Sequence, residues 1–108
     1  MARIPTRLAG PAQVSNAAAT KYTVPALTKT IVRHIHCQNP SGSAVTFTLS
    51  IGADAAGVRL FDAYSIAAGA LLDHYCYYIL AAAEIVQAFA GTNNILTLTI
   101  DGDEIVLG

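Results

Sequence analysis

The sequence predicts an all-β fold, a single antiparallel β-sandwich of about eight short strands, of either the jelly-roll or the immunoglobulin-like type. Apolar and polar residues alternate in several segments, most clearly in residues 44–51 (AVTFTLSI), where every second side chain is large and apolar. Clusters of turn-forming residues recur at intervals of about ten residues, as they do in sandwiches and barrels. The length of 108 residues suits one hydrophobic core and one domain.

The first 20 residues predict an extended N-terminal arm, and residues 21–108 predict the sandwich domain. Pro5, Gly10 and Pro11 interrupt regular structure within the arm. A terminal segment of this kind becomes ordered only where something holds it. We therefore expect the arm to pack on a neighbouring molecule or on the domain itself, and its expected role is to tether the chain to a partner through Arg3 and Arg7.

Residues 28–39 form the first long predicted strand, because β-branched residues are frequent and the pattern alternates. The alternation assigns Ile31, Arg33, Ile35 and Cys37 to one face and Val32, His34 and His36 to the other. The turn cluster Pro40–Ser43 separates this strand from residues 44–51. The sequence therefore predicts a β-hairpin over residues 28–51.

The other predicted strands are shorter. They cover residues 21–24, 58–62, 64–67, 70–80, 85–90, 95–100 and 104–107. In the strand 95–100 the alternation directs Leu96, Leu98 and Ile100 inward. The dipeptide Asp101–Gly102 is typical of a hairpin turn, which would connect the last two strands.

Charge is scarce and unevenly distributed. Charged residues make up 12% of the chain, about half of their usual share. A surface largely covered by partners explains this, and a surface of neutral Thr, Ser and Ala is the alternative. Five of the six basic residues lie within residues 1–53, and all seven acidic residues lie within residues 54–108. Either a basic face docks on an acidic neighbour, or strand pairing mixes the two charges in space.

No catalytic motif is present in the sequence, so we expect neither an enzyme nor a cofactor. His34 and His36 share a strand face and are suited to metal binding, with His74 as a third ligand, but we expect a polar strand face and no metal there. Cys37 and Cys76 lie in apolar runs and are predicted to be buried free thiols. The net charge of −1 argues against a nucleic-acid partner, and no apolar run is long enough for a membrane span.

Tyrosines concentrate in the predicted strand 70–80, where Tyr75 and Tyr77 share one face and Tyr78 points to the other. Tyrosine suits interfaces, because its ring packs while its hydroxyl forms hydrogen bonds. The sequence places no acidic or polar cluster beside these tyrosines. The candidate partner contacts are Arg3, Arg7, His34, His36, Tyr75 and Tyr77.

Several short motifs carry a family resemblance. They are Tyr22–Ala26 (YTVPA), Lys29–Val32 (KTIV), Asn39–Thr46 (NPSGSAVT), Leu60–Phe61, Ala68–Gly69 and Ile85–Ala88. Over about residues 21–101 the chain resembles small virion structural proteins of tailed bacteriophages, of the head-decoration or minor-tail type. The resemblance implies a β-sandwich module that assembles on the particle, and it supplies no catalytic residues.

The expected function is therefore that of a non-enzymatic virion structural protein, present in multiple copies on the capsid or the tail. Its expected partners are other virion proteins and copies of itself in a homo-oligomer, with neither nucleic acid nor membrane. The alternative is a host-facing carbohydrate- or receptor-binding module on the phage tail, in which Tyr75 or Tyr77 stacks on a sugar ring. A small metal-dependent protein using His34 and His36 is a third hypothesis.

Overall fold

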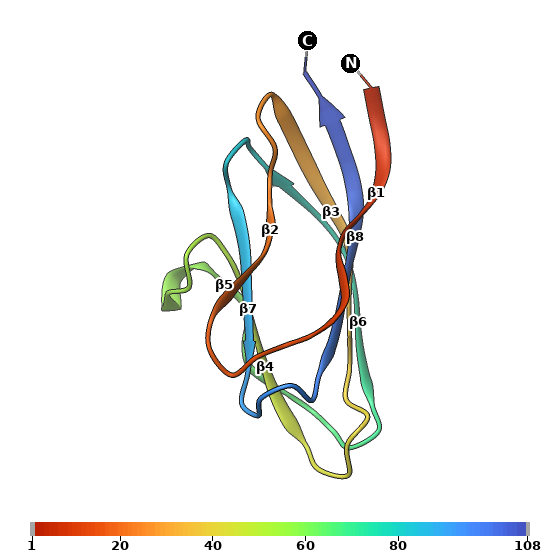
Figure 1. The fold of residues 1–108 in the computed structure, drawn as a ribbon, viewed down its shortest axis with the longest axis vertical. Helices are drawn as coiled ribbons and strands as arrows, with labels where there is room; N and C mark the ends of the chain where they lie inside the picture. Colours follow the sequence, from red (N-terminus) through yellow and green to blue (C-terminus); the bar gives the residue numbers. More distant parts are fainter. Residues whose placement is uncertain (1, 108) are drawn as a thin grey trace.

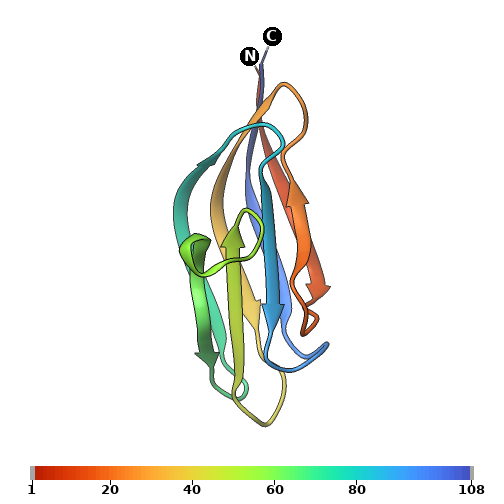
Figure 2. The ribbon, with the colours of Figure 1, turned by 90° about the vertical axis from the view of Figure 1, so that its left-hand side faces the viewer.

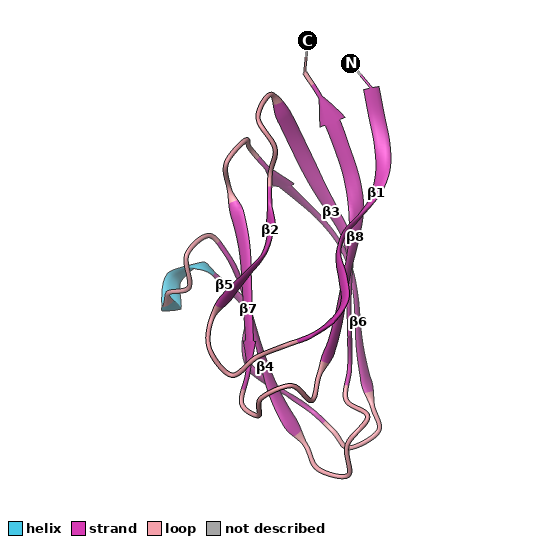
Figure 3. Ribbon diagram, viewed as in Figure 1, coloured by secondary structure: helices cyan, strands magenta, loops and turns pink. Residues whose placement is uncertain are grey.

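The computed structural model describes residues 2–107 and confirms an all-β fold of two antiparallel four-stranded sheets (Figures 1 and 3). Sheet A has the order β1-β8-β3-β6, and sheet B has the order β2-β7-β4-β5. The strands are β1 (Ala2–Gln13), β2 (Ala19–Thr23), β3 (Thr28–Gln38), β4 (Val45–Ile51), β5 (Arg59–Ile66), β6 (Leu71–Leu80), β7 (Ile85–Ala90) and β8 (Thr97–Val106), and a short 3-10 turn, η1 (Ala56–Val58), precedes β5. Among these residues, no helix is long and apolar enough to cross a membrane.

The two sheets pack face to face, and their inward side chains form one core. Figure 1 shows the two sheets as separate layers along the long axis of the molecule, and Figure 2 views sheet B face-on with sheet A behind it. Fully buried core residues come from both layers: Ile35, Cys37, Leu98 and Ile100 from sheet A, and Phe47, Leu49, Val86 and Ala88 from sheet B. Their alternation with outward residues is the pattern that a two-layer sandwich requires. The inward direction predicted for Leu98 and Ile100 is therefore confirmed.

The predicted hairpin over residues 28–51 is wrong, because β3 and β4 lie in different sheets. The connection between them crosses the sandwich and is held by the fully buried side chain of Asn39. Its Nδ2 donates hydrogen bonds to the carbonyl oxygens of Ser43 and Ile66, at 2.8 and 2.9 Å. Asn39 thus ties this connection to the end of β5. The hairpin partner of β4 is β5.

The predicted N-terminal arm is also different in the structure. Residues 2–13 form β1, which pairs with β8 from Ala2 opposite Val106 to Gln13 opposite Thr97 (Figure 1). Proline is tolerated in an edge strand, where its missing N–H need not face a partner. A register shift accommodates Gly10, where a Cβ would overlap the carbonyl oxygen of Leu98. Pro5 is therefore paired regularly opposite Asp103, and Gly10 and Pro11 lie at a bulge in the same paired strand.

A second bulge changes the predicted faces of β3. Val32 is buried in the core with Ile35, and it does not share the outer face with the histidines. The register with both neighbouring strands shifts between Val32 and His34. Because Arg33 is the extra residue relative to β8, Arg33 and His34 both face outward although they are consecutive. This bulge places a cation beside an imidazole on the outer face of sheet A.

The predicted turn at Asp101–Gly102 is absent, since β8 runs through both residues. A Cβ at Gly102 would overlap the carbonyl oxygen of Ile31 and touch Leu8, so glycine serves close packing here. The two strands predicted over residues 58–62 and 64–67 are likewise one strand, β5, with a positive φ at Ala63.

Candidate functional site on the outer face of sheet A

All six predicted contact residues lie on sheet A. Arg3 and Arg7 are on β1, His34 and His36 on β3, and Tyr75 and Tyr77 on β6. The acidic strand β8 lies between β1 and β3, opposite both of them in antiparallel register. Sheet pairing thus brings the basic N-terminal half against the acidic C-terminal half. Strand pairing therefore mixes the two charges within the chain, which was one of the two interpretations of the uneven charge distribution.

Arg3 and Arg33 share one carboxylate across three strands. The guanidinium of Arg3 donates to Asp103 Oδ2 at 2.7 and 3.0 Å, and Arg33 donates to the same oxygen at 3.2 Å. The hydrogen bond from Arg3, with the charge of both guanidiniums, holds the pKa of Asp103 below its usual range. Arg7 lies opposite Asp101 in the register. Arg3 is therefore paired within its own chain, and its expected tethering role stays a prediction.

The two predicted histidines converge on Asp73, which the sequence did not single out. Asp73 Oδ1 lies 2.6 Å from His36 Nδ1 and 2.9 Å from His34 Nε2. The backbone register explains the meeting, because Asp73 is directly opposite His36 on β6. Hydrogen bonds from His36, with the larger effect, and from His34 hold the pKa of Asp73 below its usual range, so this carboxyl is ionised at neutral pH.

The third histidine does not join this group. His74 follows Asp73 on β6 and therefore faces inward. Its Nε2 lies 3.1 Å from the Tyr78 hydroxyl, and its ring packs edge-on against Phe61 at 5.1 Å. Asp73 could have been predicted as a member of this site, because it lies two residues before Tyr75 and therefore shares the same face of the strand.

Both predicted tyrosines cover charged or polar neighbours from β3. The ring of Tyr75 stacks on His34 with a centroid distance of 4.4 Å and an angle of 8°. Tyr77 lies beneath the Arg33 guanidinium, 5.6 Å from its ring centroid, in cation–π geometry. Tyr75 nevertheless keeps 77% of its surface exposed. Its outer ring face is free to pack against another molecule.

An open hollow of about 450 Å³ lies between these side chains. It is lined by Arg33, His34, Tyr75, Cys76, Asp101 and Asp103, with Gly102. The sequence interpretation that no acidic or polar cluster accompanies the tyrosines is therefore wrong. The acidic groups come from β8, which is distant in sequence and joined to β3 by pairing.

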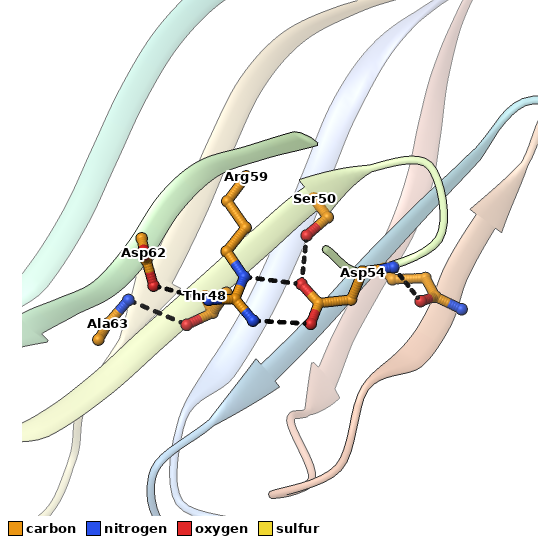
Figure 4. Close-up of polar contacts among 7 residues, drawn as sticks. Thr48, Ser50, Asp54, Arg59, Asp62 and Ala63 are labelled. Carbon is orange, nitrogen blue, oxygen red and sulfur yellow. Dashed lines mark hydrogen bonds and ion pairs between the residues drawn. The ribbon is translucent and has the colours of Figure 1, made fainter. Parts of the chain in front are cut away.

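A separate polar cluster pins a loop onto the outer face of sheet B (Figure 4). Asp54 accepts hydrogen bonds from Ser50 Oγ at 2.6 Å and from Arg59 at 2.9 and 3.0 Å. Arg59 also pairs with Asp62 at 3.0 Å. The bonds from Arg59 and Ser50 lower the pKa of Asp54 to about 2. Ser50 is fully buried beneath this cluster, so its role is to hold the loop.

The prediction of free thiols is confirmed for both cysteines. Cys37 is fully buried in the core, and burial raises its pKa to about 12. Cys76 is half-buried, and desolvation raises its pKa as well. Raised thiol pKa values oppose nucleophilic chemistry at either residue.

Comparison with known proteins finds no matching family model, no matching curated protein and no matching solved structure.

Proposed function

We propose that this chain is a non-enzymatic structural protein of a bacteriophage virion, present in multiple copies on the capsid or tail, and that its sandwich is a jelly roll. The observation that carries the proposal is a row of exposed apolar side chains on the outer face of sheet A. The virion assignment itself rests on the sequence resemblance over residues 21–101.

The strand order supports the jelly-roll part of the proposal. A jelly roll winds eight strands through two sheets as two Greek keys, and viral capsid and lectin domains use it. Among residues 2–107, β4 and β5 are consecutive strands that pair within one sheet, and the other consecutive strands alternate between the sheets. The orders β1-β8-β3-β6 and β2-β7-β4-β5 follow from such winding.

The exposed row lies along one edge strand. Four of the five outward residues of β6 are large and apolar, namely Leu71, Tyr75, Tyr77 and Ile79, and each keeps more than half of its surface exposed; the fifth is Asp73. Soluble monomers seldom align several large apolar side chains in this way, and such patches mark interaction sites. In a chain with only 12% charged residues, this face is the place where a covered surface is expected.

The two edge strands of sheet A differ in how strongly they discourage contact with another sheet. Edge strand β1 contains Pro5, Pro11 and two arginines, which are features that discourage contact with another sheet. Edge strand β6 contains neither proline nor lysine. The β6 side is therefore the better docking surface. We assign a second copy of the chain as its occupant, because the same face carries both arginines and aspartates and can pair with itself about a two-fold axis.

Light-scattering mass of the purified chain tests this assembly. We expect a defined oligomer for the unaltered protein and a monomer for the double variant Tyr75→Ser/Ile79→Ser. The control is Tyr64→Ser, since Tyr64 is an exposed tyrosine on β5 of sheet B and its loss should leave the oligomer intact. A monomer for the unaltered chain at every concentration, or an unchanged oligomer in the double variant, would contradict the proposal.

A carbohydrate-binding module on the phage tail is the second candidate, and the hollow beside Tyr75 favours it. An exposed ring next to Arg33, Asp101 and Asp103 combines a stacking surface with hydrogen-bonding groups. Glycan binding by the unaltered chain that is lost in Tyr75→Ala would support this function. Absence of binding across a panel of bacterial cell-wall glycans would count against it.

A further inference from the structure

We propose that His34, His36 and Asp73 form a binding site for one divalent first-row transition-metal ion, of which Zn²⁺ is the natural probe. The three ligand atoms lie within 4.8 Å of one another. This inference goes beyond structural assembly and does not depend on it, because all three ligands belong to one chain.

The backbone of two paired strands brings the three ligands together. His34 and His36 are two residues apart on β3, so both imidazoles leave the same face. Asp73 is the cross-strand partner of His36 on β6. Each ligand therefore stands on a hydrogen-bonded strand, and paired strands hold a ligand set more accurately than a loop does.

The two carboxylate–imidazole distances suit a small ion after a slight opening, and the imidazole ligand atoms lie within 4.8 Å of each other. Zn–N distances of about 2.0–2.1 Å and Zn–O distances of about 2.0–2.2 Å separate tetrahedral ligand atoms by roughly 3.3–3.5 Å. Asp73 Oδ1 now lies 2.6 Å from His36 Nδ1 and 2.9 Å from His34 Nε2. The carboxylate must therefore retreat by less than ~1 Å, which a small rotation of its exposed side chain provides.

Neighbouring side chains already orient the His34 ring. Its Nδ1 lies 3.9 Å from Asp101 Oδ2, on the side away from Asp73. Tyr75 stacks on the ring with nearly parallel planes. Metal-ligating histidines commonly donate a hydrogen bond from their second nitrogen to a carboxylate, and a small approach of Asp101 to His34 Nδ1 would complete that arrangement here.

The ligand types select the class of ion. Two imidazoles favour transition metals such as Zn²⁺ over Ca²⁺ and Mg²⁺, which prefer oxygen ligands. Three protein ligands leave one tetrahedral position, and in the single chain a water molecule would take it. His74 lies outside the site, since its ring faces Tyr78 and Phe61.

Isothermal titration of the metal-free chain with Zn²⁺ at neutral pH tests the site. We expect one ion per chain, with His36→Ala and Asp73→Ala each weakening binding by more than 100-fold. Asp101→Asn should weaken it about 10-fold, which is the usual effect of removing a partner of a metal-bound histidine. The matched control, His74→Gln, should bind as the unaltered chain does.

Cobalt substitution gives a readout that does not depend on any variant folding. Co²⁺ bound to the unaltered chain should give the intense visible bands of a four- or five-coordinate ion, and Zn²⁺ should displace it. Zn²⁺ should also raise the melting temperature, and Ca²⁺ at the same concentration should not. Absence of stoichiometric Zn²⁺ binding, or full binding in a folded His36→Ala variant, would overturn the proposal.

Discussion

Replacing Asn39 should destabilise the sandwich more than any other single polar substitution in its loops. Nδ2 of Asn39 donates to three carbonyl oxygens, those of Ser43 at 2.8 Å, Ile66 at 2.9 Å and Ala67 at 3.3 Å. Oδ1 accepts from the backbone nitrogen and the hydroxyl of Ser41, at 3.1 and 2.7 Å. One side chain thus fixes the β3–β4 crossing and the turn that follows β5.

The free-energy cost of Asn39→Ala follows from these contacts. Each net hydrogen bond contributes about 1 kcal/mol, and a buried acceptor left without a donor costs about 1–3 kcal/mol. The bond to Ile66 is buried, whereas the groups of Ser41 can turn to water. We therefore expect a loss of about 3 kcal/mol, a large fraction of the ~5–15 kcal/mol typical of a domain. The corresponding drop in melting temperature is roughly 10–20 °C.

Urea unfolding followed by far-ultraviolet circular dichroism measures this loss, since the chain has no tryptophan. Asn39→Asp keeps the acceptor but directs a carboxylate at three carbonyls, so it should cost at least as much as alanine. The control is Asn93→Ala, because Asn93 accepts a single exposed bond at 3.2 Å from Asn16. That change should cost less than ~0.5 kcal/mol. A loss below ~1 kcal/mol for Asn39→Ala would refute the reasoning.

Three further predictions concern single residues. The folded pKa of Asp54 is about 2 against an ordinary 3.8, so its pairing with Arg59 stabilises the fold above about pH 4, and this contribution disappears as the pH falls toward 2. Asp54→Asn should accordingly lower the melting temperature at pH 6 and converge with the unaltered chain near pH 2; a constant difference over that interval would contradict this linkage. Gly102→Ala should cost about 2 kcal/mol or more in urea unfolding, because the new Cβ meets the backbone of β3, and an unchanged midpoint would count against that packing. In thiol titration Cys76 should react before Cys37, whose buried thiol should react only on unfolding, and two equally fast thiols would argue against the buried position of Cys37.

The sequence predicted strand positions better than strand partners. Alternation in residues 44–51 reports which side chains face the core, and Phe47 and Leu49 are indeed fully buried. The same alternation carries no information about the neighbouring strand. The hairpin over residues 28–51 was inferred from closeness along the chain, whereas the buried bonds of Asn39 direct β4 into the other sheet.

Bulges account for most of the other differences. If side chains on β3 alternated strictly between the two faces, Val32 would share a face with the histidines. Arg33 is an extra residue relative to β8, so Val32 faces the core instead. Gly10 and Pro11 were predicted to end regular structure, but edge strand β1 accommodates both in a register shift. Steric demands of this kind depend on the partner strand, which periodicity does not identify.

The candidate site was predicted in part. His34, His36, Tyr75 and Tyr77 were singled out for their residue types, and all four lie close together on sheet A. Asp73 and Asp101 were missed as members of that group, because they join it only through the pairing of β6 and β8 with β3. The site is thus a product of sheet order as much as of residue type.

Side-chain footprinting of tyrosines by hydroxyl radicals and mass spectrometry tests the central claim, assembly through the outer face of sheet A, most directly. Tyr75, Tyr77 and Tyr64 are all exposed in the single chain, so all three should be modified in dilute solution. At concentrations where the mass shows an oligomer, we predict protection of Tyr75 and Tyr77, with Tyr64 on sheet B still modified. Protection of Tyr64 alone, or equal modification of all three in the oligomer, would contradict the account.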